Sequence, residues 1–195
     1  NVIFFTFIAF GLLGLYDDMV KVFSLKALRF RHKFTIQLIL AGVAASLLYF
    51  NLHIDIINIP FLGVLRLGWG YIPLATLTIL AFTNAFNITD GLDGLAGGLL
   101  LICLLAFWGL SVQYLDTPLS VFIALWIGSL IAFLYFNIYP SRVWLGNAAG
   151  LAFGATLAVV GLLLGNIVAI FVIGGVFMAE LGSCVLQFIW QKVSG

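Results

Sequence analysis

Four of the seven acidic residues of this sequence occur in two pairs beside long apolar runs. Asp17 and Asp18 follow the run that opens the chain, and Asp90 and Asp93 stand between two other runs. Carboxylates are costly near a bilayer and are found there mainly where they serve a site. Adjacent carboxylates repel each other unless a cation lies near them, and Mg²⁺ prefers oxygen ligands and accepts phosphate. The two pairs therefore predict a divalent-metal site that handles phosphate.

Lysine and amide side chains accompany both pairs. Lys21 follows the first pair by one helical turn, which brings its ammonium to the same helix face. Taken alone, that pattern is more simply a solvated helix end. Asn84 and Asn87 precede the second pair in NAFNITDGLDGLAGG. An ordinary Asn/Asp/Gly turn explains the glycines of this segment but not the two additional amides, so we expect it to hold a metal and a phosphate or sugar.

A third polar segment, FNIYPSRVWLGNAAG, spans residues 136–150. Arg142 is a candidate for binding phosphate, and Trp144 offers an aromatic face to a base or sugar. The stretch 146–150 precedes an apolar run, so its amides would face an anion at a helix N-terminus. Each residue also has a simpler interpretation, Arg142 as a positive-inside anchor and Trp144 as an interfacial aromatic residue.

The elements that must position these residues are membrane helices. The sequence is 64% hydrophobic and 8% charged, which predicts an all-α integral membrane protein with six or seven transmembrane helices. The predicted spans are 1–16, 34–50, 71–86, 95–114, 119–138, 149–164 and 166–190. The spans 34–50, 71–86 and 149–164 are short for a bilayer. We therefore expect them to extend into flanking residues or to surround a site. Segment 51–70 predicts a small outer β-hairpin. The net charge of +1 argues against a nucleic-acid partner.

Basic residues fix the expected orientation, because Lys and Arg collect on the cytoplasmic side. Alternating sides along the spans places seven of the eight basic residues on one face, namely Lys21, Lys26, Arg29, Arg31, Lys33, Arg142 and Lys192. Only Arg66 falls on the other face. The same alternation puts both acidic pairs on the basic face. The sequence thus predicts a site at the cytoplasmic surface.

These motifs resemble those of the polyprenyl-phosphate hexosamine-1-phosphate transferase superfamily. The matching segments are GLYDDMVKV, RHKF, NAFNITDGLDGLAGG, FNIYPSRVWLGN and GGVFMAELGSCVLQ, in family order. The resemblance implies a multi-pass enzyme of the bacterial inner membrane with a cytoplasmic active site. Such enzymes use Mg²⁺ to move a sugar-1-phosphate from a UDP-sugar onto a polyprenyl phosphate. The TDGLDGLA form is most similar to the branch that transfers phospho-MurNAc-pentapeptide to undecaprenyl phosphate in peptidoglycan synthesis. A homodimer is left open.

The resemblance also implies a role for each matching residue. Asp17 and Asp18 match the acidic pair, one of which deprotonates the lipid phosphate or acts as nucleophile. Asn87, Asp90 and Asp93 match the loop that contacts the nucleotide-sugar, and we expect Asp90 and Asp93 to be catalytic together with Asp17 and Asp18. The remaining matches are substrate-binding: Lys21 and Lys33 facing the phosphates, Asn137 as a polar site residue, and Trp144 stacking on uracil.

Two departures from the family pattern bear on activity. Asn147 stands where the resemblance implies an Asp that binds metal with Asp17 and Asp18, and a neutral amide should hold Mg²⁺ less well. The family's first spans and its His-rich C-terminal loop are also without a match. We therefore expect residues 1–195 to be a single membrane domain cut from a longer transferase.

Other functions remain as alternatives. A GlcNAc-1-phosphate transferase of the same superfamily would use the same chemistry. A non-catalytic copy would keep the fold after losing the charge at Asn147. A transporter would place its acids inside its spans and show internal repeats, whereas the paired acids here lie at span ends on one face and no repeat is found.

Overall fold

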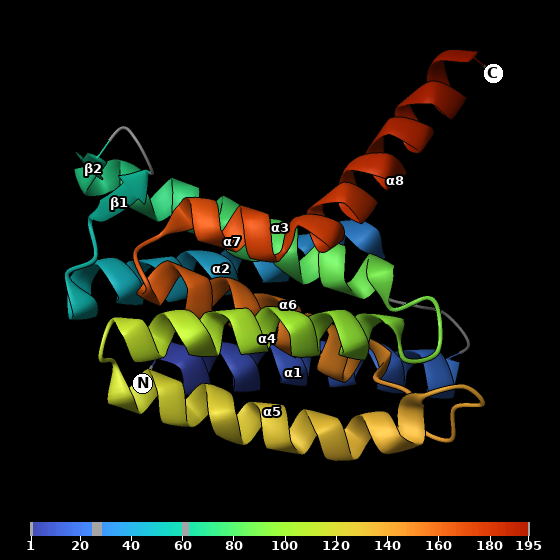
Figure 1. Ribbon diagram of the computed structural model, residues 1–195. Helices are drawn as coiled ribbons and strands as arrows, with labels where there is room; N and C mark the ends of the chain where they lie inside the picture. The colour runs from blue at the N-terminus through green and yellow to red at the C-terminus, as the bar shows by residue number, and fades with distance from the viewer. Residues whose placement is uncertain (1, 25–28, 60–62, 195) are drawn as a thin grey trace.

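The computed structural model describes residues 2–24, 29–59 and 63–194, and these are mostly helical (Figure 1). The helices are α1 (Val2–Ser24), α2 (Phe30–Leu52), α3 (Tyr71–Thr89), α4 (Leu95–Gln113), α5 (Thr117–Asn137), α6 (Gly146–Leu163), α7 (Ile167–Ile173) and α8 (Gly175–Ser194). Six are long and apolar enough to cross a membrane alone, and the bent pair α7–α8 can provide a seventh span. The predicted all-α membrane fold is confirmed.

Several helices extend beyond the predicted apolar runs. Helix α1 continues to Ser24 instead of ending near residue 16, so Asp17, Asp18 and Lys21 lie on its last two turns. Helix α2 begins at Phe30, which places Lys33 on its first turn. Helices extend in this way because backbone groups in a membrane must find hydrogen-bond partners within their own segment. These four polar residues are consequently held by helices and not by loops.

Several threonine hydroxyls inside the spans are satisfied within their own helices. Thr6 donates to the carbonyl of Val2 at 2.9 Å, and Thr83 donates to Ile79 at 2.6 Å. This return to the carbonyl four residues earlier is the usual way a Ser or Thr is accommodated in an apolar helix. These hydroxyls need no partner elsewhere in the bundle.

Helix α6 forms the centre of the bundle. It packs against α1 and α3, while α2 packs against α3 and α1, and α4 against α5. Of the six long helices, α6 is the most buried. Figure 1 shows α4 and α5 running alongside each other. The first turn of α6 therefore meets the last turns of α1 and α3 at one end of the bundle.

The last predicted span, 166–190, is broken in the structure. Helix α7 begins after Asn166, whose Oδ1 accepts a hydrogen bond from the Ala169 amide at 3.0 Å, an ordinary N-cap. The chain then bends by 75° between α7 and α8. The break falls at Gly174 and Gly175, and paired small residues are a recognised cause of kinks. Helix α8 projects away from the bundle (Figure 1).

A two-stranded sheet lies at the opposite end of the bundle from the loops that follow α3 and α5 (Figure 1). Strands β1 (Ile56–Ile59) and β2 (Gly63–Arg66) are antiparallel, with Ile56 opposite Arg66. The Asn58 amide donates to the Gly165 carbonyl at 3.0 Å and ties the hairpin to the α6–α7 connection. The predicted hairpin is confirmed. Lys26, used above to predict orientation, lies outside the described residues.

Candidate active site

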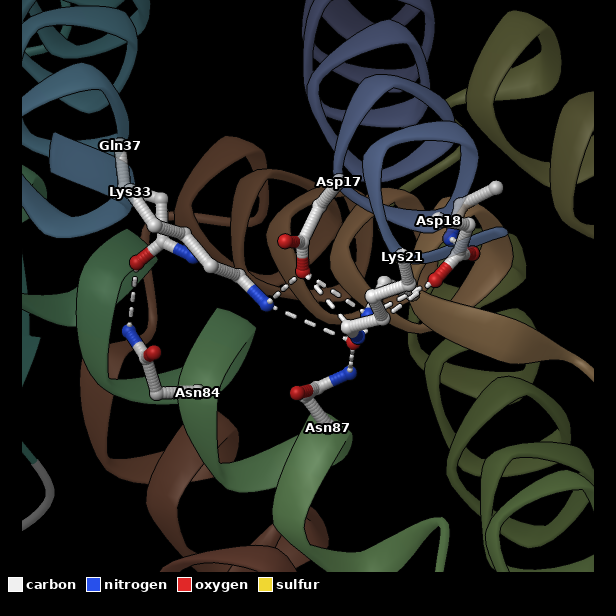
Figure 2. A network of polar contacts seen from close by, with 9 residues as sticks. Asp17, Asp18, Lys21, Lys33, Gln37, Asn84 and Asn87 are labelled. Atoms are coloured by element: carbon white, nitrogen blue, oxygen red, sulfur yellow. Dashed lines mark hydrogen bonds and ion pairs between the residues drawn. The ribbon is translucent and has the colours of Figure 1, made fainter. Parts of the chain in front are cut away.

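Polar side chains from four helices meet where α1 ends and α6 begins (Figure 2). We call them the central cluster: Asp17, Asp18 and Lys21 from α1, Lys33 from α2, Asn87 from α3, and Asn147 from α6. These residues come from all three polar segments of the sequence and from the basic segment that opens α2. The fold brings them into direct contact.

Asp17 is the buried anion of the central cluster, with 2% of its surface exposed. Its Oδ2 accepts from Lys33 Nζ at 3.1 Å and from Asn147 Nδ2 at 3.0 Å. Lys21 Nζ lies 3.3 Å from the same oxygen. A buried carboxylate is tolerated only when it is paired and hydrogen-bonded, and these donors meet that need. Asp17 therefore holds both ammonium groups in place.

Asp18 reaches from α1 to the first turn of α6. Its Oδ2 accepts from the Ala148 backbone amide at 3.1 Å, and its Oδ1 accepts from Asn147 Nδ2 at 2.8 Å. Helix α6 has no capping side chain of its own, so Asp18 satisfies one of its free amides. Gly146 has φ +62°, and a Cβ there would lie 2.9 Å from Asp18 Oδ2. A side chain at position 146 would therefore be strained and would crowd this contact.

Asn147 lies between the two carboxylates and the α3 amide. Its Nδ2 donates to Asp17 and Asp18, while its Oδ1 accepts from Asn87 Nδ2 at 2.9 Å and faces Lys33 Nζ at 3.4 Å. Gly14 lets α1 approach the Asn147 backbone so closely that a Cβ on Gly14 would overlap it. This tight helix contact fixes the position of Asn147 relative to the acidic pair.

An amide pair beside the central cluster joins Asn84, of the second polar segment, to Gln37, a residue that no motif predicted. Asn84 Nδ2 donates to Gln37 Oε1 at 3.0 Å, joining α3 to α2 (Figure 2). Gln37 is 1% exposed, and its Nε2 has no partner among the described residues. The available signal was a Gln inside an apolar run, four residues after Lys33 and so on the same helix face.

Asn137 joins the loop before α4 to the loop before α6. Its Oδ1 accepts from the Gly94 amide at 3.1 Å, and its Nδ2 donates to the Val143 carbonyl at 2.8 Å. Asp93 Oδ2 accepts from the Ser141 amide at 3.1 Å and links the same loops. We call these five residues the loop junction. Asn137 is 3% exposed, so its amide serves the protein's own backbone.

Asp90 and Asp93 are in different environments. Asp90 follows α3 and is half-buried, and this burial raises the pKa of its carboxyl group. Asp93 is exposed, and hydrogen bonds from the Ser141 hydroxyl and backbone amide lower the pKa of its carboxyl group. Within the described parts of the chain, neither shares a hydrogen bond or ion pair with the central cluster. The second acidic pair therefore makes no such contact with the central cluster, and Asp93 belongs to the loop junction instead.

Arg142 and Trp144 have exposed side chains on the loop before α6. Trp144 is 70% exposed and lies at an apolar groove of about 470 Å³. Side chains of α1, α5 and α6 line this groove, among them Phe7, Trp126 and Phe153. Trp144 therefore combines an open face with an apolar surround, as an aromatic residue that meets a base or a lipid would.

The described residues do not fit a bound Mg²⁺ as they are arranged. No three His, Cys, Asp or Glu side chains converge in the described segments. Where Asp17 and Asp18 face each other, the NH₂ group of Asn147 lies between them and donates to both. Mg²⁺ requires oxygen ligands in near-octahedral geometry, and an NH₂ group cannot supply one.

The central cluster can instead bind phosphate through its lysines. The carboxylates of Asp17 and Asp18 carry a charge of −2, and the ammonium groups of Lys21 and Lys33 carry +2, so the net charge is zero. An ammonium has three N–H donors, and Lys33 directs two toward Asp17 and Asn147. Lys21 is 41% exposed at its side chain and can reach outward. The carboxylates hold these ammonium groups, which leaves N–H donors for a phosphate oxygen.

Comparison with known proteins places the central cluster within a recognised family region. The family model described as Glycosyl transferase family 4 matches residues 1–165 of the chain. This range contains every residue of the central cluster and the loop junction. It ends before α7, so the bent pair α7–α8 lies beyond it.

Relatives of similar sequence carry one name, phospho-N-acetylmuramoyl-pentapeptide-transferase. The protein of Acetivibrio thermocellus is 33% identical over 98% of this chain and 59% of its own length. That of Aquifex aeolicus is 34% identical over 100% of this chain and 59% of its own length. That of Listeria monocytogenes is 31% identical over 99% of this chain and 60% of its own length. The chain thus spans about three fifths of the relatives it matches.

Proposed function

Because the chain belongs to glycosyl transferase family 4, we propose that its central cluster binds the phosphates of a phospho-sugar transfer reaction. The observation that carries this proposal is the contact of Lys21 and Lys33 with the buried carboxylate of Asp17. Helices α1 and α2 fix these groups at one end of a multi-pass membrane bundle. A pre-arranged cationic site of this kind stabilises charge that moves between phosphoryl oxygens.

The proposed substrates are a UDP-sugar and a polyprenyl phosphate. The names of the relatives support phospho-MurNAc-pentapeptide as the transferred group. The proposed acceptor is undecaprenyl phosphate, as the family motifs imply. The basic residues near the central cluster support a cytoplasmic location for the site, in the plasma membrane of a bacterium.

The proposed reaction exchanges one phosphoanhydride bond for another. An oxygen of the polyprenyl phosphate attacks the phosphorus that carries the sugar, the bond to the uridine phosphate breaks, and UMP leaves. Lys33 and Lys21 face the phosphate oxygens and offset their charge. Asp17 positions the two ammonium groups, and Asp18 fixes the first turn of α6. We expect Asp93, held in the loop junction, and the exposed Trp144 to contact the donor.

Mg²⁺ is the cofactor that the family motifs imply, and it would supply Lewis-acid stabilisation of the transferred phosphate. The geometry described above does not fit that ion, so no step of the proposed reaction passes through it. Asn147 also supports a second candidate function. A chain that binds the substrates but transfers slowly would retain the lysines and the fold while lacking the carboxylate at this position.

A transfer assay separates the two candidates. Membranes containing the complete gene product are given labelled UDP-MurNAc-pentapeptide and undecaprenyl phosphate, and labelled lipid is counted. We expect labelled product from wild type and about 100-fold less from Lys33→Met. Lys192→Met, an exposed lysine on α8, is the matched control and should equal wild type. Substrate binding without labelled lipid in wild type would favour the slow binder, whereas neither binding nor transfer would contradict both.

A further inference from the structure

Asn147 makes the contacts that a cation would otherwise make between two carboxylates. Its Nδ2 lies 3.0 Å from Asp17 Oδ2 and 2.8 Å from Asp18 Oδ1. Adjacent carboxylates repel each other unless something positive lies between them. One amide group here donates a hydrogen bond to each carboxylate. The acidic pair is thereby joined by a group of the protein itself.

The orientation of the Asn147 amide follows from its neighbours. Ionised carboxylates can only accept hydrogen bonds, so Asp17 and Asp18 require the NH₂ group. An ammonium can only donate, so Lys33 Nζ, 3.4 Å from Oδ1, requires the carbonyl oxygen on the other side. Turning the amide over would replace these three favourable contacts with three repulsive ones. The arrangement of donors and acceptors is therefore specific.

The backbone keeps this amide in place. Gly14 brings α1 against the Asn147 backbone, and Gly146 adopts φ +62° beside Asp18 Oδ2. The Ala148 amide, one residue after Asn147, donates to Asp18 at 3.1 Å. Contacts on either side of position 147 thus tie it to α1. The backbone at position 147 is therefore held close to the acidic pair.

We propose that the Asn147 amide replaces a divalent cation in this chain, so that the acidic pair is assembled without metal. With Asn147, the charges of Asp17, Asp18, Lys21 and Lys33 sum to zero. A carboxylate at position 147 would give −3 + 2 = −1, would remove both bridging donors, and would place three carboxylates together. That arrangement needs a cation, and carboxylate oxygens are the ligands that Mg²⁺ prefers. The residue type at 147 therefore decides whether the site requires metal.

The test compares Asn147→Asp with wild type in the complete gene product, using Mn²⁺ as the probe. Bound and free Mn²⁺ are separated by electron paramagnetic resonance, and thermal unfolding is recorded in EDTA and in Mg²⁺. We expect wild type to unfold at the same temperature in both. We expect Asn147→Asp to unfold at a lower temperature in EDTA, to recover with Mg²⁺, and to bind Mn²⁺ at least about tenfold more tightly than wild type.

Two further variants make the result specific. Asn166→Asp makes the same chemical change at the N-cap of α7, where a carboxylate can still accept from Ala169, and should behave as wild type. Asp18→Asn combined with Asn147→Asp returns the central cluster to its original charge and should recover thermal stability in EDTA. This double variant also remains informative if Asn147→Asp alone fails to fold.

Tight Mn²⁺ binding by wild type, equal to that of Asn147→Asp, would overturn the proposal. So would a wild-type unfolding temperature that falls in EDTA, or a double variant that gains no stability over Asn147→Asp in EDTA. Metal binding and unfolding are measured without substrate. A failed transfer assay therefore leaves this test intact, and a failure here leaves phosphate binding by the lysines intact.

Discussion

Asp18 caps a helix to which it does not belong. Its carboxylate accepts from the Ala148 amide at 3.1 Å, across the contact between α1 and α6. The pairing explains how an acidic residue at the end of one membrane span can be retained for structure as well as for chemistry. We therefore expect substitutions of Asp18 to change stability in addition to their effect on the proposed transfer reaction.

Replacing Asp18 should therefore destabilise α6. Asp18→Ala removes the only side-chain cap described for this helix and should lower the free energy of unfolding by about 1 kcal/mol. Thermal unfolding in lipid nanodiscs measures the change. Asp116→Ala is the matched control, because Asp116 caps α5 through Leu119 at the other end of the bundle. The control should lose similar stability and keep full substrate binding.

The two lysines of the central cluster should differ in their effect on stability. Lys33 is 17% exposed at its side chain and Lys21 is 41% exposed, while both contact buried Asp17. Removing a buried partner leaves the other charge uncompensated, so Lys33→Met should cost about 3 kcal/mol. Lys21→Met should cost about 0.5 kcal/mol, as for an exposed pair. Denaturant unfolding compares them, and a larger loss for Lys21→Met would contradict the assigned contacts.

Asn137 should act through the backbone of the loop junction. Asn137→Ala leaves the Gly94 amide and the Val143 carbonyl without their buried partner, at a cost of about 3 kcal/mol. Hydrogen exchange at the Gly94 amide should become faster in Asn137→Ala, because the amide loses its hydrogen-bond acceptor. Asn51→Ala, at the exposed end of α2, should change neither quantity. Unchanged exchange at Gly94 in Asn137→Ala would show that the contact is not formed in solution.

Asp90 and Asp93 should give pH dependences of opposite sign. Burial raises the pKa of Asp90, so the folded protein holds that proton more tightly than the unfolded chain. Stability from Asp90 is thus present below the ordinary value of 3.8 and falls as pH rises toward the raised folded pKa. The lowered pKa of Asp93 gives a contribution that is present above 3.8 and lost as pH falls through the folded pKa.

Unfolding temperatures measured between pH 3 and pH 7 test these signs. At each pH, the unfolding temperature of the Asn variant is subtracted from that of wild type. Asp90→Asn should be at least as stable as wild type at pH 7, because it removes an ionised, half-buried carboxylate. Asp93→Asn should instead be less stable than wild type at pH 7, and this difference should shrink at pH 3. Equal slopes for the two variants would contradict the different environments of these residues.

Much of the architecture could be predicted from apolar runs and charge alone. Spans are long and strongly apolar, and their number and the outer hairpin follow from that pattern. Their ends could not be predicted, because the chain continues as helix through polar residues such as Asp17 and Lys33. The 75° break at Gly174 also escaped prediction, since a broken span and a continuous one have the same composition.

The candidate site was predictable in its residue types but not in its pairings. Alternation of the predicted spans led us to expect Asp17, Asp18 and Asn147 on one face of the membrane. That Asn147 bridges the two acids depends on the close approach of α1 to α6 at Gly14, which spacing does not reveal. Gln37 was missed because a single amide in an apolar run has no distinctive motif. Asn137 was expected to bind substrate, and its burial against backbone could only be seen in three dimensions.

Phosphate binding by the central cluster is tested most directly by equilibrium binding of radiolabelled UDP-MurNAc-pentapeptide to the complete gene product in nanodiscs. Wild type, Lys33→Met and Lys192→Met are compared at the same salt concentration. We predict saturable binding to wild type and to Lys192→Met, and at least about tenfold weaker binding to Lys33→Met, because a charged hydrogen bond to phosphate is lost. Equal affinity in all three proteins would contradict the account, as would the absence of binding to wild type.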